Sequence, residues 1–217
     1  MTKPVAVNVP GNTVVQDNAG DFLLVNIDPG DTDKPCSLPI GVPLTSPPWT
    51  DIKTAKITQL GNGDVELTIS LYARVPEAPS FFVSYIWQFE SRCLFPTPGK
   101  VYKDCVVVWW DPDVGHWQGN WRVITSCDPR TIEPGDPVEF RFTKDGVRAR
   151  VKQDDLMLAT SGDKIIWHAA VRRLPFVFAG YPNTIPVDVA PDVLALNSEP
   201  PPFMLHPEDP ATWVPRP

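Results

Sequence analysis

The sequence predicts an all-β fold, a single antiparallel β-sandwich. Short apolar runs alternate with polar residues at a period of two, turn residues separate these runs at intervals of about ten residues, and no segment has a convincing helical stripe. The 27 prolines lie between the runs, where they mark loops and strand ends. With 42% apolar residues among 217, the chain can build a packed core.

The clearest alternation lies in two central segments, 65–73 and 81–90. Every second side chain there is apolar, which predicts strands with one buried face. Further strands are expected at 104–110, 120–125, 164–173 and 174–181. The expected core positions of the two central segments are Leu67, Ile69, Leu71, Val83, Tyr85, Trp87 and Phe89.

A hairpin is predicted at Asp145-Gly146, because this dipeptide between two alternating runs is a strong turn signal. The alternation places one set of side chains in the core and a basic set outside. Phe140, Phe142, Val147, Ala149 and Val151 are expected to face the core, and Arg141, Arg148 and Arg150 the solvent.

The two ends differ from the predicted sandwich domain, residues 21–196. Residues 1–20 are polar and expected to be irregular, and the proline-rich residues 197–217 are expected to form a tail or a strap along the surface. The best helix candidate, 153–163, is short and contains a glycine stop.

Composition and charge limit the classes of partner that the chain can bind. A net charge of −7 and a pI near 4.9 disfavour a nucleic acid or an anionic membrane surface and leave neutral ligands and cations. No apolar run is long enough to predict a membrane span, and the first residues do not resemble a signal peptide.

The four cysteines, Cys36, Cys93, Cys105 and Cys127, lack the CxxC spacing of a zinc site. Disulfides or buried thiols are therefore expected. Three pairings are open, and Cys93 with Cys105 is the first to test because the two flank one loop. An even cysteine count favours an oxidising compartment, so an extracellular or periplasmic location is expected.

Acidic loops broken by glycine or proline lie near both ends, DPGDTD at 28–33 and VDVAPDV at 187–193. Their order around PPWTDIKTAKITQLGNGDVELTISL, the paired strands and KDGVRARV resembles the family 9-like carbohydrate-binding modules and the related DOMON-like domains over about residues 22–193. The resemblance implies a jelly-roll-like sandwich whose first and last strands lie close together. Where such domains often carry an Asp- and Asn-rich turn, this chain has FESRCLFPTPGKVYKDC, which argues against a second calcium site there.

Calcium is the cofactor expected at these loops, because it takes six to eight oxygens from carboxylates and backbone carbonyls. The resemblance implies that Asp28 and Asp31 lie near Asp188, with Asp192 as a further candidate ligand. Asp51, in PWTDI, is the next candidate. The alternative is a pair of solvated turns, since Asp-Pro-Gly-Asp is common turn chemistry.

Four of the eight tryptophans fall within thirteen positions, in VVVWWDPDVGHWQGNW. Adjacent residues on a strand point to opposite faces, so one of each neighbouring pair can be exposed. An exposed indole beside short polar groups suits a sugar ring, whereas sandwiches also use tryptophan to fill the space between sheets. The candidate ligand-binding residues are Trp109, Trp110, Asp111, Asp113, His116, Trp117, Asn120 and Trp121.

The function expected from these features is a non-catalytic, calcium-stabilised binding module with a carbohydrate or another neutral small molecule as ligand. One alternative is an enzyme on the same sandwich, either similar to calcium-dependent cyclases or using carboxylates such as Asp111, Asp113 and Glu90. The other is a structural or adhesive domain of a larger exported protein. Haem-binding DOMON-like domains use a Met and a His, and Met157 and His168 are present, although core filling is the commoner role of such residues.

Overall fold

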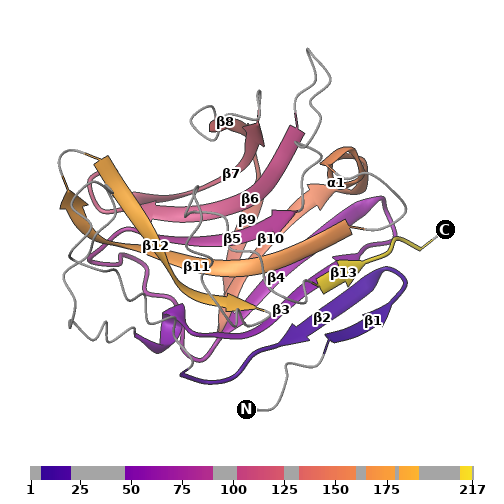
Figure 1. Ribbon diagram of the computed structural model, residues 1–217, viewed down its shortest axis with the longest axis horizontal. Coiled ribbons are helices and arrows are strands. Elements are labelled where there is room, and N and C mark those ends of the chain that lie inside the picture. The colour runs from indigo at the N-terminus through magenta and orange to yellow at the C-terminus, as the bar shows by residue number, and fades with distance from the viewer. Residues whose placement is uncertain are drawn as a thin grey trace, which may run out of the picture.

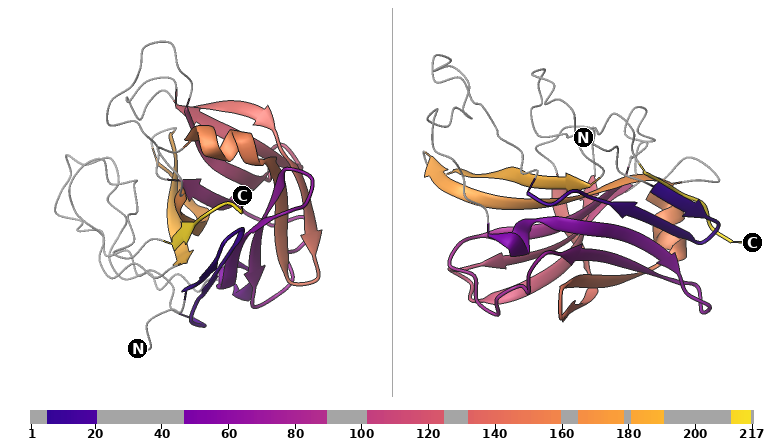
Figure 2. Two further views of the ribbon diagram at one scale, coloured as in Figure 1. Left: turned by 90° about the vertical axis from the view of Figure 1, so that its right-hand side faces the viewer. Right: turned by 90° about the horizontal axis from the view of Figure 1, so that it is seen from below.

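The computed structural model describes residues 6–20, 47–89, 102–124, 132–159, 165–178, 181–190 and 211–216. Two antiparallel β-sheets pack face to face in this part of the chain (Figures 1 and 2). The all-β sandwich predicted from the sequence is thereby confirmed. None of the helices in these ranges has the length and apolarity that a bilayer crossing needs.

One sheet has six strands: β1 (Ala6–Val9), β2 (Asn12–Gln16), β3 (Ile52–Gln59), β4 (Asp64–Leu71), β9 (Glu139–Thr143) and β10 (Gly146–Lys152). They lie in the order β1-β2-β3-β4-β10-β9. The 3-10 turn η1 (Pro48–Thr50) leads into β3.

The other sheet has seven strands: β5 (Val83–Phe89), β6 (Tyr102–Asp111), β7 (His116–Ile124), β8 (Ile132–Pro137), β11 (Ile165–Phe178), β12 (Tyr181–Ala190) and β13 (Ala211–Trp213). The order is β12-β11-β5-β6-β7-β8, and β13 also pairs with β11. The short helix α1 (Gln153–Ala159) follows β10 and contacts β6 and β10.

The core lies between the sheets and follows the alternation read from the sequence. In β4 and β5, every residue assigned to the core is at most 2% exposed. Most core residues are aliphatic, but each aromatic side chain among them removes more apolar area from water than an aliphatic one. The largest fully buried side chains include Trp87, Trp167, Trp213, Tyr85 and Phe89.

The amino-terminal segment differs from its prediction. Residues 1–20 were expected to be irregular, but β1 and β2 form a hairpin at the edge of the six-stranded sheet. Gly11 takes the left-handed conformation in its turn, with φ of 79°. Val15 and Thr13 are buried, so β2 belongs to the packed structure.

Two predictions in the carboxyl-terminal half also need correction. The strands expected at 164–173 and 174–181 are one long strand, β11, with a register irregularity between Arg173 and Phe176. No strand was predicted over most of β12, and the acidic loop expected at 187–193 overlaps its last residues. β12 lies at the edge of its sheet, where Pro182 and Pro186 are tolerated because an edge strand has no second neighbour.

Residues 153–163 were the best helix candidate, although they lack a convincing stripe of apolar residues. Helix α1 forms at the start of this segment and buries Leu156 completely.

Residues 211–216 of the proline-rich tail are part of the packed structure and not only a strap along the surface. Ala211 and Trp213 are buried, and β13 pairs with β11 (Figure 1). On its other side, the Gly11 amide donates to the Val214 carbonyl at 2.6 Å, and the Thr13 hydroxyl donates to the Thr212 carbonyl at 2.7 Å. The tail therefore connects the two sheets.

Cys105 is buried in β6. Cys36, Cys93 and Cys127 lie outside the described residues, so the disulfide pairings stay predictions.

The Asp145-Gly146 hairpin is confirmed in both register and orientation. Val147 pairs with Phe142 and Ala149 with Phe140. Val147, Ala149 and Val151 are buried, the two phenylalanines pack on the core, and Arg141 and Arg150 are exposed. Arg148 is half-buried on the outer side.

Gly146 is required by the close approach of β4. A Cβ at this position would lie 2.1 Å from the Ile69 carbonyl oxygen and 2.9 Å from Ser70 Cα. We expect Gly146→Ala to lower the free energy of unfolding by about 1–3 kcal/mol, the usual cost of overpacking. Gly61→Ala is the matched control, because nothing lies within 4 Å of its Cβ position. Urea denaturation measures both, and equal effects of the two variants would contradict the prediction.

Candidate functional site

The clustered tryptophans are divided between the two faces of the seven-stranded sheet. Trp110 and Trp121 are buried in the core between the sheets. Trp109 is half-buried on the outer face and packs against the cluster of Ile86, Cys105, Val107 and Ala170. Trp117 is half-buried and packs against the core from the end of the sandwich.

The predicted polar partners are also divided. Asp111, Asp113 and His116 belong to the β6–β7 turn, where the Asp111 carboxylate accepts the Asp113 amide at 2.9 Å. Asn120 pairs with Val107, and therefore stands on the outer face with Trp109. The eight predicted residues do not form one cluster.

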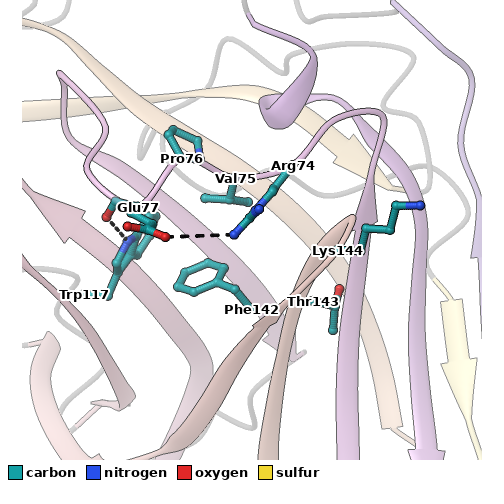
Figure 3. A pocket seen from close by; sticks show the side chains of 8 residues that line it. All are labelled: Arg74, Val75, Pro76, Glu77, Trp117, Phe142, Thr143 and Lys144. Carbon is teal, nitrogen blue, oxygen red and sulfur yellow. Dashed lines mark hydrogen bonds and ion pairs between the residues drawn. The ribbon is translucent and has the colours of Figure 1, made fainter.

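Trp117 lines a groove of about 630 Å³ (Figure 3). The β4–β5 loop, the start of β7 and the β9–β10 hairpin supply its walls. The other lining residues are Arg74, Val75, Pro76, Glu77, Phe142, Thr143 and Lys144. The sequence identified Trp117 as a candidate but not these neighbours, since the loop residues form no motif and Phe142 was assigned to the core.

The Trp117 ring is fixed from several sides. Its centroid lies 4.6 Å from that of Phe142, 5.7 Å from that of Trp110 and 6.0 Å from that of Tyr85. Its Nε1 donates to the Glu77 carbonyl at 3.0 Å. A ring held in this way loses little conformational entropy when a ligand binds.

The rim of the groove carries mixed charge. Arg74 and Glu77 form an ion pair at 3.9 Å with side chains 73% and 94% exposed, so the pair adds little stability and can rearrange. In Figure 3 both side chains lie beside the Phe142 ring. Among the described residues that line the groove, Glu77 is the one carboxylic acid.

A second candidate region lies where β3 meets β12. Asp51, directly after η1, is 5% exposed, and its Oδ2 accepts the Gly20 amide at 2.9 Å. Asp188, in β12, is 1% exposed, and its Oδ2 accepts the amide of Ile52. The structure therefore brings two predicted calcium ligands to the start of β3.

Asp17 is a third buried carboxylate close to the start of β3, and no sequence motif points to it. Its amide donates to the Lys53 carbonyl at 3.1 Å, and its carbonyl accepts the Tyr72 hydroxyl at 3.3 Å. Asp28, Asp31 and Asp192 lie outside the described residues. Within the part of the chain that the structure describes, no three acidic, His or Cys side chains are grouped closely enough to hold a metal ion.

Asp51 has an unusual environment for a carboxylate. Within the described ranges, its Oδ1 is buried and has no hydrogen-bond partner. Burial raises the pKa of Asp51 above its ordinary value, and the hydrogen bond from Gly20 opposes this shift. A buried, half-satisfied carboxylate is stabilised by either a proton or a cation.

Comparisons with protein families, curated proteins and solved structures found no match. The likeness to family 9-like carbohydrate-binding modules therefore stays a hypothesis.

The raised pKa of Asp51 has a consequence for stability. The folded chain binds a proton at this site at a higher pH than the unfolded chain, so this contribution to stability is lost as the pH rises through the folded pKa. In buffer with chelator, Asp51→Asn should gain stability relative to the wild type between about pH 4 and about pH 7. Urea denaturation at both pH values measures the difference, and a constant difference would contradict the prediction.

Proposed function

We propose that this chain is a non-catalytic binding module whose ligand, a carbohydrate, occupies the groove beside Trp117. The observation that supports this function is a half-buried indole, fixed by the Glu77 carbonyl and Phe142, on the wall of an open groove. A sugar ring presents C–H groups to such an aromatic surface and hydroxyls to a polar rim.

Trp117 is preferred to the other three clustered tryptophans for a physical reason. Trp110 and Trp121 are buried in the core, where no ligand reaches them without unfolding. Trp109 packs on apolar side chains of the outer sheet face and does not line the groove. The proposed site retains Trp117 from the sequence prediction and adds Arg74, Glu77 and Phe142.

We also propose a structural calcium ion at the start of β3, with Asp51 and Asp188 among its ligands. The unpaired Oδ1 of Asp51 and the burial of both carboxylates support this proposal, because a cation would offset charge that burial makes costly. Asp28, Asp31 and Asp192 remain candidate ligands. When bound, the ion would supply positive charge that holds β3 and β12 together, and no reaction step.

Glycan binding tests the groove. Soluble neutral oligosaccharides should change the tryptophan fluorescence of the wild type, and Trp117→Ala should weaken binding by at least about 30-fold, the equivalent of about 2 kcal/mol. Trp109→Ala is the matched control and should retain binding. The stability lost in Trp117→Ala should be below the roughly 3–5 kcal/mol typical of a fully buried aromatic residue.

Two results would count against the groove. Loss of binding in Trp109→Ala with retention in Trp117→Ala would move the site to the outer sheet face. If no glycan in a broad panel binds, the structural or adhesive role becomes the better hypothesis.

Thermal unfolding tests the calcium site. Chelator should lower the melting temperature and added calcium restore it, since a ligand of the folded state stabilises by about 2.7 kcal/mol at 100 times its Kd. Asp51→Asn and Asp188→Asn should lose most of this response, whereas Asp113→Asn, in the exposed β6–β7 turn, should keep it. An identical melting temperature with chelator and with calcium would eliminate the proposed ion.

A further inference from the structure

The outer face of the six-stranded sheet carries side chains in straight rows across four strands, β3, β4, β10 and β9. The register defines one row that we call the basic row: Lys56, Thr68, Arg148 and Arg141. Neighbouring strands are about 4.8 Å apart, so the row spans the middle of the sheet with a cation on three of its four strands. The row nearer the hairpin is Thr54, Ser70, Gly146 and Thr143.

The basic row carries three cations, and the acids of the same face, Glu66, Glu139 and Asp64, lie in the two rows beyond it. Arg148 and Arg141 are direct cross-strand partners, an arrangement of like charges that costs stability. They share one carboxylate, that of Glu66, at 3.2 and 3.3 Å. In the next row, Arg150 of β10 stands opposite Glu66 of β4 and Glu139 of β9. Within the described ranges, Lys56 and Arg150 form no ion pair, and the buried Nε of Arg148 has no acceptor.

A nearby pair shows the contrasting case. Lys152 bonds Asp64 on the adjacent strand, and this contact lowers the pKa of the Asp64 carboxyl. Lys152 is therefore neutralised by a carboxylate of its own, whereas Arg148 and Arg141 of the basic row share the single carboxylate of Glu66.

The composition of the face favours one class of partner. Hydroxyls of Thr54, Ser70 and Thr68 stand among the cations, and no aromatic side chain belongs to either row. Protein interfaces concentrate aromatic anchors, and sheets that bind single-stranded nucleic acid use aromatic rings to stack bases. Cations interspersed with hydroxyls suit a sugar chain that carries negative groups.

The basic face and the Trp117 groove are neighbours. Thr143 belongs to the row nearer the hairpin and also lines the groove, together with Lys144 of the same hairpin. An extended ligand that passes over the β9–β10 hairpin can therefore contact both.

We propose that the outer face of the six-stranded sheet binds an anionic polysaccharide, whose carboxylate or sulfate groups lie over the basic row and whose chain continues into the Trp117 groove. This inference rests on the proposed carbohydrate function and names its ligand class.

Binding of the full chain to polygalacturonate and to dextran sulfate tests the proposal, with fully methyl-esterified polygalacturonate and plain dextran as neutral counterparts. The wild type should bind at least one anionic polymer more tightly than its neutral counterpart, with an affinity that falls as salt is added. Lys56→Gln combined with Arg150→Gln should weaken this binding about tenfold or more at low salt and reduce its salt dependence. Neither substitution removes an ion pair, and melting temperatures check the fold.

Arg122→Gln is the matched control, because Arg122 is an exposed cation on the other sheet. Equal losses in the control and the double variant would overturn the proposal, as would equal binding of single-stranded DNA and the anionic glycans. If neutral glycans bind through Trp117 and anionic polymers bind no more tightly, the anionic ligand class is wrong. The carbohydrate site in the groove would still be supported. If binding of anionic polymers depends on Lys56 and Arg150 but not on Trp117, the result would support the site on the outer sheet face and contradict the site in the Trp117 groove. If no glycan binds, both proposals fail.

Discussion

The register between neighbouring strands determines both faces of this sandwich. Inside, Tyr85, Trp87 and the aliphatic residues of β4 are fully buried, so a slip by one residue would replace them with residues such as Gln88 of β5 and Thr68 of β4. The register that buries the core also fixes the outer rows, because side chains alternate. It aligns the cations of β3, β10 and β9, and it sends the adjacent indoles of Trp109 and Trp110 to opposite sides.

Polar contacts connect the two sheets where apolar packing ends. Asp188 in β12 accepts the amide of Ile52 in β3, and the Val214 carbonyl, next to β13, accepts the Gly11 amide beside β2. These contacts differ in electrostatic cost. The carbonyl is neutral, whereas Asp188 and Asp51 place ionisable groups in a buried region where charge is destabilising without compensation. A cation is therefore more useful at the start of β3 than at the tail.

Local alternation predicted the parts of the fold that depend on one buried face. It predicted β4, β5 and the β9–β10 hairpin with the correct faces. Asp51 and Asp188, which were singled out as candidate calcium ligands on other grounds, both lie at the start of β3. Local alternation failed for β12 and the amino-terminal hairpin, since prolines and polar residues are tolerated at sheet edges. The groove was beyond local patterns because its walls come from three segments far apart in the sequence, which meet only through the sheet order.

Net charge is a weak guide to the partner of a sheet protein, because cations can be grouped on one part of a face. The total of −7 argued against polyanions. At physiological ionic strength, however, charges more than about 8 Å apart are largely screened when they face solvent. A ligand on the outer face of the six-stranded sheet would contact Lys56, Arg148 and Arg141 directly, and the nearest acids, Glu66 and Glu139, lie in the adjacent row of the same face. The local row therefore outweighs the total in deciding which ligand charge this face accepts, and the total acts on the rate of approach.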